Sequence, residues 1–154
     1  MDGDAEDMPL LAQLALSTLI TASTVTLHLL GLAVLMRLIR GHRSRTPERG
    51  AILHDVLGIA GAAFGLFVLH AAEIWLYAAV YAVSGALAGF EEALYFSTST
   101  YTTVGYGDLV LPKGWRVLGA IEGANGIILL GWSTAFFVSV VGRIRMLELD
   151  AGDR

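Results

Sequence analysis

Residues 103–107 read Thr-Val-Gly-Tyr-Gly, and Asp108 follows them. The two glycines can adopt backbone angles that a side chain would forbid, so an extended strand here can point successive carbonyl oxygens to one side. A row of carbonyl oxygens suits a cation that has lost its water shell, but one strand cannot encircle an ion. Four copies around an axis would make stacked rings, with the Thr103 hydroxyls closing the innermost site. The carbonyls of these rings would come from Thr103, Val104, Gly105 and Tyr106.

A short helix is predicted immediately before this stretch. Glu91 and Glu92 precede residues 93–101, and the helix macrodipole favours acidic residues in a first turn. The negative end of this helix would point toward the ion path, where it favours a cation. Non-helical backbone at membrane depth is tolerated only where it is buried in protein or lines water. We therefore expect a re-entrant pore helix and filter loop over residues 89–108.

The composition is that of a membrane protein. Apolar residues make up 55% of the 154 residues, the mean hydropathy is +0.65, and only 16% of residues are charged. These values are too apolar for a water-soluble domain of this length. The chain has no cysteine, which excludes disulfides and thiolate metal sites, and it has no basic stripe that would predict a nucleic-acid partner.

Three apolar runs are long enough to cross a bilayer, for which about 20 residues are needed. Five arginines, half of the ten Lys and Arg residues, gather at and after the end of the first run. The positive-inside rule places this loop in the cytoplasm, the N-terminus outside and, after three crossings, the C-terminus in the cytoplasm. The predicted segments are an external tail at 1–9, a first span at 10–38, a basic cytoplasmic loop at 39–50, a pore module at 51–148 (outer helix 51–84, inner helix 115–148) and a cytoplasmic tail at 149–154.

Residues 103–107 and Asp108, set after a short helix and between two spans, resemble the selectivity filter of potassium channels. The resemblance covers about residues 71–145, the two-transmembrane pore module of that family, so the first span makes this an all-α, three-helix variant. It implies a homotetramer in the cell membrane that conducts K⁺ passively, with no enzymatic activity and no cofactor besides the permeant K⁺. The alternatives are a non-conducting regulatory or sensing membrane subunit and a weakly selective cation channel.

Departures from the family pattern concern the support of the filter. Many relatives have two tryptophans where this chain has Tyr95 and Phe96, and some bacterial relatives have a glutamate at the position of Ser99. We therefore expect the layer of side chains that surrounds and supports the filter to be weaker here, or to be held by other groups. The residues that we expect to support the filter are Tyr95, Ser99, Thr102, Asp108 and Glu122.

The inner helix has a glycine that resembles the hinge of the family, Gly126. By the same match, four residues spaced three and four apart would face the central cavity, and this spacing lies on one helical face. The alternative is an ordinary packed stripe. The four residues are Ile127, Leu130, Thr134 and Val138.

Glu122 lies inside the third span and on the helical face opposite to the predicted cavity. Ionisable groups at such depth are costly unless partnered and are functional by default. We expect Glu122 to join a buried polar cluster behind the filter with His70 or Ser99. The alternative is a protonated glutamate with one backbone acceptor.

Other polar residues of the spans receive plainer interpretations. His70 and Glu73 share a helical face but are too few for a metal site, so a hydrogen-bonded packing role is favoured. His28 is expected to snorkel or to pair with a neighbouring threonine, and His54 to lie at a solvated helix start. The first span lacks regularly spaced arginines, so we expect no voltage sensing, and the nine residues after Arg145 predict no cytoplasmic ligand-binding domain.

Overall fold

Three long helices and one short helix form the protein, for which a computed structural model describes residues 8–43 and 51–152. Within these ranges the structure is helical and has no strand, so the predicted all-α fold is confirmed. The chain runs through α1 (Leu10–Arg43), α2 (Ala51–Val83), α3 (Phe90–Tyr101), a single 3₁₀ turn (Lys113–Trp115) and α4 (Arg116–Gly152).

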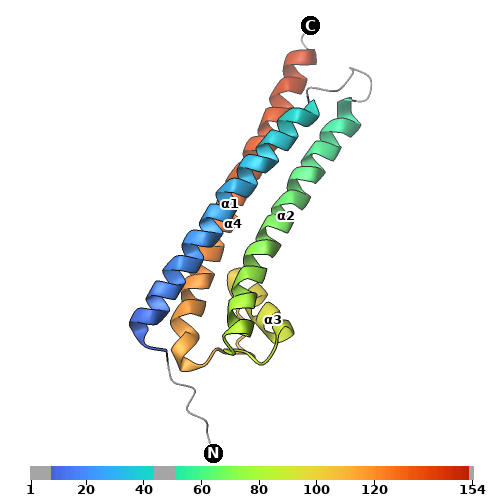
Figure 1. The fold of residues 1–154 in the computed structure, drawn as a ribbon. Coiled ribbons are helices and arrows are strands. Elements are labelled where there is room, and N and C mark those ends of the chain that lie inside the picture. Colours follow the sequence, from blue (N-terminus) through green and yellow to red (C-terminus); the bar gives the residue numbers. More distant parts are fainter. Residues whose placement is uncertain (1–7, 44–50, 153–154) are drawn as a thin grey trace, which may run out of the picture.

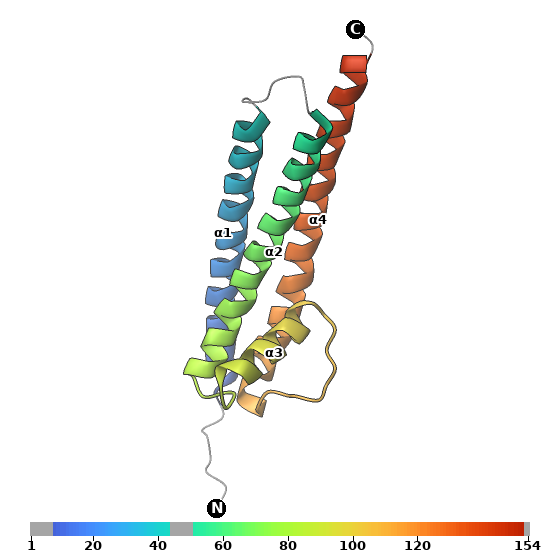
Figure 2. The same cartoon turned by 90° about the vertical axis from the view of Figure 1, so that its right-hand side faces the viewer.

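The three long helices lie side by side, and α3 lies at the end where α1 begins (Figures 1 and 2). The parts of these helices that are long and apolar enough to cross a membrane are Leu10–Gly41, Val56–Val83 and Lys113–Gly142. Three candidate spans were predicted, and three are present in the described part of the chain. The predicted external tail, basic loop and C-terminal tail lie partly outside the described residues.

Two helices extend beyond their predicted ends. The first was predicted to stop at residue 38 but continues to Arg43, and the last continues to Gly152. Neither extension contains a proline. Each contains one glycine, which destabilises a helix by only about 1 kcal/mol relative to alanine. The apolar run in the sequence predicts only the part of a helix that lies in the membrane. The helix itself continues until a residue disfavours helical backbone, so it can be longer than its membrane-spanning part.

The short helix α3 is held in the angle between α2 and α4 (Figure 2). The largest fully buried side chains gather around it, including Tyr77 and Tyr81 of α2, Tyr101 of α3, and Leu118 and Leu129 of α4. Burying apolar area stabilises a structure by roughly 25 cal/mol per Å². The core thus lies at the α3 end and fixes the position of the loop that follows α3.

Gly126 lets α4 approach the end of α3. A Cβ atom at this position would overlap the carbonyl group of Tyr101, which is backbone and cannot turn aside. Gly126 was predicted to be a hinge. In the structure a glycine is needed at this position because a side chain would not fit against the backbone of α3.

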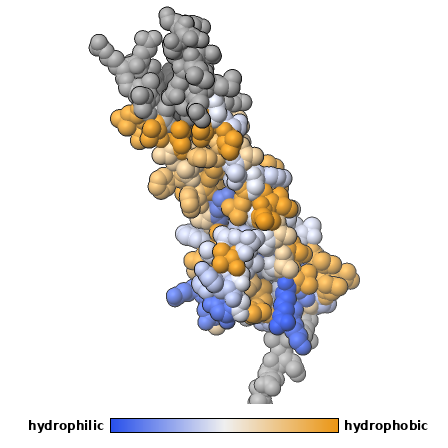
Figure 3. All heavy atoms as spheres, turned by 180° about the vertical axis from the view of Figure 1, so that it is seen from behind, coloured by the Kyte–Doolittle hydropathy of each residue, from blue (hydrophilic) through white to orange (hydrophobic). Residues whose placement is uncertain are grey.

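The outside of the helix bundle is apolar. Large side chains such as Phe64, Phe67 and Trp75 of α2 are mostly exposed. The space-filling view shows hydrophobic residues over much of the bundle and hydrophilic residues gathered toward the α3 end (Figure 3). Exposed apolar surface of this extent suits contact with lipid or with further protein chains rather than with water.

Candidate functional site

The backbone of residues 103–107 is unusual at every second residue. Thr103 has φ 62°, Gly105 has φ 54° and Gly107 has φ 78°, all in the left-handed region. Thr103 is the one non-glycine residue with positive φ among the described residues. A β-branched side chain is strained in this region by roughly 1–3 kcal/mol, and such strain clusters at functional sites.

The end of α3 anchors this segment. The amide of Thr103 donates to the Thr100 carbonyl (3.0 Å), and the amide of Gly105 donates to the Ser99 carbonyl (3.1 Å). The Ser99 hydroxyl accepts a longer bond from the amide of Tyr106 (3.4 Å). Thr102, which caps α3, donates its hydroxyl to the Thr98 carbonyl (2.7 Å). Ser99 and Thr102, both predicted supports, thus lie where they hold the loop to the helix.

Tyr95 and Asp108 form a second link between α3 and the loop. The Tyr95 hydroxyl donates to the Asp108 carboxylate over 2.7 Å, and the Tyr95 ring stacks on that of Tyr106 with ring centres 6.5 Å apart. This hydrogen bond lowers the pKa of Asp108 and raises the pKa of Tyr95. The carboxylate therefore stays charged.

The segment itself is open on one side. Every residue from Thr103 to Asp108 is exposed in the single chain, including Val104 (54%) and Tyr106 (73%). Apolar side chains therefore lie exposed next to the strained backbone of this segment in the single chain.

Glu122 lies in a buried polar cluster, but its partners differ from those predicted. Its carboxylate accepts hydrogen bonds from the Tyr81 hydroxyl (2.7 Å) and from the Ser97 hydroxyl, and all three side chains are fully buried. We call these three residues the Glu122 cluster. The predicted partners Ser99 and His70 are wrong, and so is the alternative of a lone backbone acceptor.

Helix geometry explains both errors. Ser99 is two residues, or about 200°, further around α3 than Ser97, so Ser97 faces α2 and α4 while Ser99 faces the loop. His70 is eleven residues before Tyr81, which separates them by about 16 Å along α2.

The sequence matches the family described as "Ion channel" over residues 59–143, which is more than half of the chain. The chain belongs to this ion channel family. The matched segment contains most of α2, all of α3, the loop after it and most of α4, whereas α1 lies outside it. With its three apolar helices, the channel chain is a multi-pass membrane protein. No curated protein and no solved structure matches the chain.

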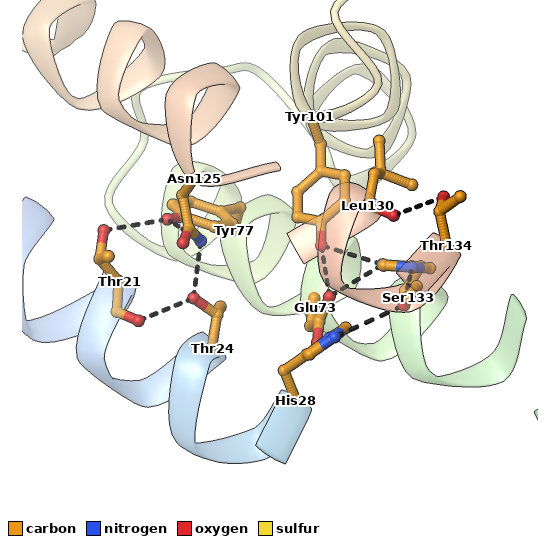
Figure 4. Close-up of polar contacts among 11 residues, drawn as sticks. Thr21, Thr24, His28, Glu73, Tyr77, Tyr101, Asn125, Leu130, Ser133 and Thr134 are labelled. Carbon is orange, nitrogen blue, oxygen red and sulfur yellow. Dashed lines mark hydrogen bonds and ion pairs between the residues drawn. The ribbon is translucent and has the colours of Figure 1, made fainter. Parts of the chain in front are cut away.

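A second buried cluster joins α1 to the matched part of the channel. Glu73 of α2 lies 2.8 Å from Nδ1 of His28 and 3.1 Å from Nδ1 of His70, and it accepts a hydrogen bond from the Tyr101 hydroxyl. Nε2 of His70 lies 2.9 Å from the Ser133 hydroxyl. We call these five residues the Glu73 cluster. Figure 4 labels His28, Glu73, Tyr101 and Ser133 of this cluster.

This arrangement corrects one prediction and confirms another. His28 does not snorkel or bond a threonine, because its ring faces Glu73 across the α1 and α2 interface. The hydrogen-bonded role predicted for His70 and Glu73 is confirmed, and His28 joins them as a third residue of metal-binding type. The sequence contained one sign of the contact between His28 and Glu73. Each span holds few ionisable groups, and a buried ionisable group needs a partner, which another span can supply.

A third set of buried polar residues fixes α1 against α4. The Asn125 amide donates to the Thr24 hydroxyl (2.8 Å) and to the Tyr77 hydroxyl (3.2 Å), which lies 3.4 Å from the hydroxyl of Thr21 (Figure 4). Interhelical hydrogen bonds of this kind in membranes contribute about 0.6 kcal/mol on average.

The predicted cavity stripe lies on the open side of α4. Ile127, Thr134 and Val138 are exposed, and Leu130 is half-buried against the core. Leu130 and Thr134 line a groove of about 530 Å³ between α2, α3 and α4, and His70 also borders it. Three of the four residues are thus exposed in the single chain, and a face toward other subunits or toward a cavity stays the prediction for the stripe.

Proposed function

We propose that this channel is selective for K⁺ and that residues 103–107 form its selectivity filter. The observation that carries the proposal is the positive φ at Thr103, Gly105 and Gly107. In an ordinary extended strand the pleat alternates, so successive peptide groups face opposite ways. Left-handed angles at every second residue break this alternation and favour carbonyls that share one side, as a row of K⁺ ligands requires.

The channel is proposed to be a homotetramer. One chain supplies a quarter of each carbonyl ring, and its filter segment is exposed. A heterologous contact repeated around a fourfold axis closes on itself and completes the rings. The apolar outer faces of α1 and α2 then contact lipid.

Ion passage follows from this arrangement. K⁺ enters a cavity lined by the stripe on α4, where the negative C-terminal end of α3 favours a cation. Carbonyls of Thr103, Val104, Gly105 and Tyr106 then replace its water, and several adjacent weak sites let ions leave as readily as they enter. The Asp108 carboxylate, kept charged by Tyr95, attracts cations at the outer end.

The orientation in the membrane is proposed from the arginines of residues 37–49, which put the N-terminus outside and the C-terminus in the cytoplasm. The natural chain has no cysteine, so single cysteines report their own position. Arg43→Cys should react with an impermeant thiol reagent from the cytoplasmic side and Lys113→Cys from the outside. Reaction of both from one side would refute the orientation.

The test of the function is flux through the purified channel in liposomes, with reversal potentials in K⁺ and Na⁺ gradients. We expect strong preference for K⁺, and we expect Gly105→Ala to abolish flux, because an alanine with positive φ costs about 1–2 kcal/mol in each of four subunits. Gly58→Ala is the matched control, since a Cβ there meets no atom within 4 Å and the backbone is helical. Equal permeation of Na⁺ would support a weakly selective channel, and absence of flux would support a non-conducting subunit.

A further inference from the structure

The Glu73 cluster contains three side chains of metal-binding type from two helices. His28 of α1 and His70 and Glu73 of α2 each offer one ligand atom, and these atoms all lie within 4.8 Å of one another. Figure 4 shows the His28 ring of α1 next to the Glu73 carboxylate of α2. We propose that these three residues bind a divalent transition-metal ion of the zinc class, which ties α1 to the rest of the channel.

The donor set has the right chemistry. Two imidazoles and one carboxylate, with a fourth position left for water or another oxygen, form a known zinc coordination set. Tetrahedral geometry with bonds of about 2.0–2.1 Å puts ligand atoms about 3.3 Å apart. The carboxylate oxygens lie 2.8 Å and 3.1 Å from Nδ1 of His28 and of His70. The ligand atoms all lie within 4.8 Å of one another, so the most distant pair would have to close by at most about 1.5 Å to admit the ion.

The surroundings hold the ligands in place. The Ser133 hydroxyl lies 2.9 Å from Nε2 of His70 and 3.5 Å from Nε2 of His28, and the Tyr101 hydroxyl donates to Glu73. Groups that bond the far nitrogen of a ligating histidine fix its tautomer and orientation. One serine on α4 therefore orients both imidazoles.

Charge in this region favours a cation. Glu73 and His28 are fully buried, and no Lys or Arg occurs at residues 10–36, 56–83 or 117–142. A buried carboxylate in an apolar span needs a positive partner, and the basic groups that face Glu73 from its own and the neighbouring helices are the two imidazoles. A dication bound by these groups would place two positive charges beside the buried carboxylate.

An entry path exists beside the site. His70 is partly exposed and borders the groove of about 530 Å³ that opens between α2, α3 and α4. An ion can reach His70 from this groove without separating α1 from α2. The site is distinct from the filter, so its occupancy does not depend on K⁺ selectivity.

The experiment uses the purified full chain, stripped with a chelator, and titrates it with Zn²⁺ while heat is recorded. We expect one saturable ion per chain and a higher midpoint of thermal unfolding with Zn²⁺ than with chelator, because an ion that binds the folded state stabilises it. Titration with Co²⁺ should give the visible absorption of a cobalt ion with nitrogen and oxygen ligands.

Variants separate this site from incidental binding. His28→Gln, His70→Gln and Glu73→Gln should each remove the saturable binding, and Ser133→Ala should weaken it by about 10–100-fold. His54→Gln is the matched control, because this histidine precedes His70 by 16 positions in the sequence, and it should leave binding unchanged.

Two results would overturn the proposal. One is a parent chain whose unfolding midpoint is the same with Zn²⁺ as with chelator, a result that needs no variant to fold. The other is Zn²⁺ binding that survives in all three ligand variants or is lost equally in His54→Gln. In both cases the Glu73 cluster is a hydrogen-bonded link between helices and nothing more.

Discussion

Removing the Glu122 carboxylate should weaken the attachment of α3 to the long helices. Glu122 of α4 accepts hydrogen bonds from Tyr81 of α2 and Ser97 of α3, so it links the three elements that position the filter segment. In Glu122→Leu both donors lose this acceptor. The Ser97 hydroxyl keeps a second acceptor, the Ile74 carbonyl at 3.0 Å, whereas the described contacts of Tyr81 include no other acceptor.

The expected loss of stability comes mainly from Tyr81, because Ser97 keeps a second acceptor and Tyr81, among the described contacts, does not. A buried hydroxyl without a partner costs about 1–3 kcal/mol, so Glu122→Leu should destabilise each chain by about that amount through Tyr81. Glu122→Gln keeps an acceptor and the side-chain volume and should cost about 1 kcal/mol. Removing both partners, in Tyr81→Phe with Glu122→Leu, should be less harmful than the sum of the single changes by about 0.5–3 kcal/mol.

The assay is the thermal midpoint of the assembled channel at fixed protein and K⁺ concentrations, together with K⁺ flux after a heat step. The double-variant cycle isolates the Tyr81 and Glu122 pair from general loss of packing. Effects of Tyr81→Phe and Glu122→Leu that add within about 0.5 kcal/mol would show that the pair is not coupled and refute the reasoning.

Two further predictions concern the filter support and the helix contact behind it. Tyr95→Phe removes the hydrogen bond that lowers the pKa of Asp108, so its pKa should rise toward the ordinary value. Because the lowered pKa keeps the carboxylate charged until the pH falls through it, K⁺ current should fall at a higher external pH in the variant; identical pH profiles would contradict this. Gly126→Ala should prevent assembly, since its Cβ would overlap the Tyr101 carbonyl, whereas Gly131→Ala on the same helix meets no atom within 4 Å and should assemble. Equal yields of assembled channel from both would refute the close-contact argument.

The sequence alone predicted the class of protein and the layout of its helices. Runs of apolar residues longer than a bilayer is thick can be read one position at a time, without knowing what they contact. Residues 103–107 could also be recognised without knowing what they contact, because the spacing of their glycines and the short helix before them are local features of the sequence. The family match over residues 59–143 confirms the ion channel class, and the selectivity for K⁺ stays a prediction.

The partners of the polar residues were decided by the tertiary structure. Sequence reasoning placed Glu122 in a buried cluster but chose Ser99, whereas a rotation of about 200° along α3 makes Ser97 the residue that faces it. His28 was assigned to its own helix because the nearest hydroxyl groups in the sequence are there. Its contact with Glu73 spans 45 positions, and no local pattern encodes it.

The physical reason is that hydropathy determines which residues enter a membrane, but not the rotation and tilt of each helix within it. Each residue turns a helix by about 100°, so one position changes which neighbour a side chain meets. Packing of small groups sets that rotation, as at Gly126, where the backbone of α3 fixes the approach of α4. The proposed filter sequence and the three spans can therefore be recognised in the sequence, whereas the Glu73 cluster, with side chains from α1, α2, α3 and α4, exists only once the helices have packed.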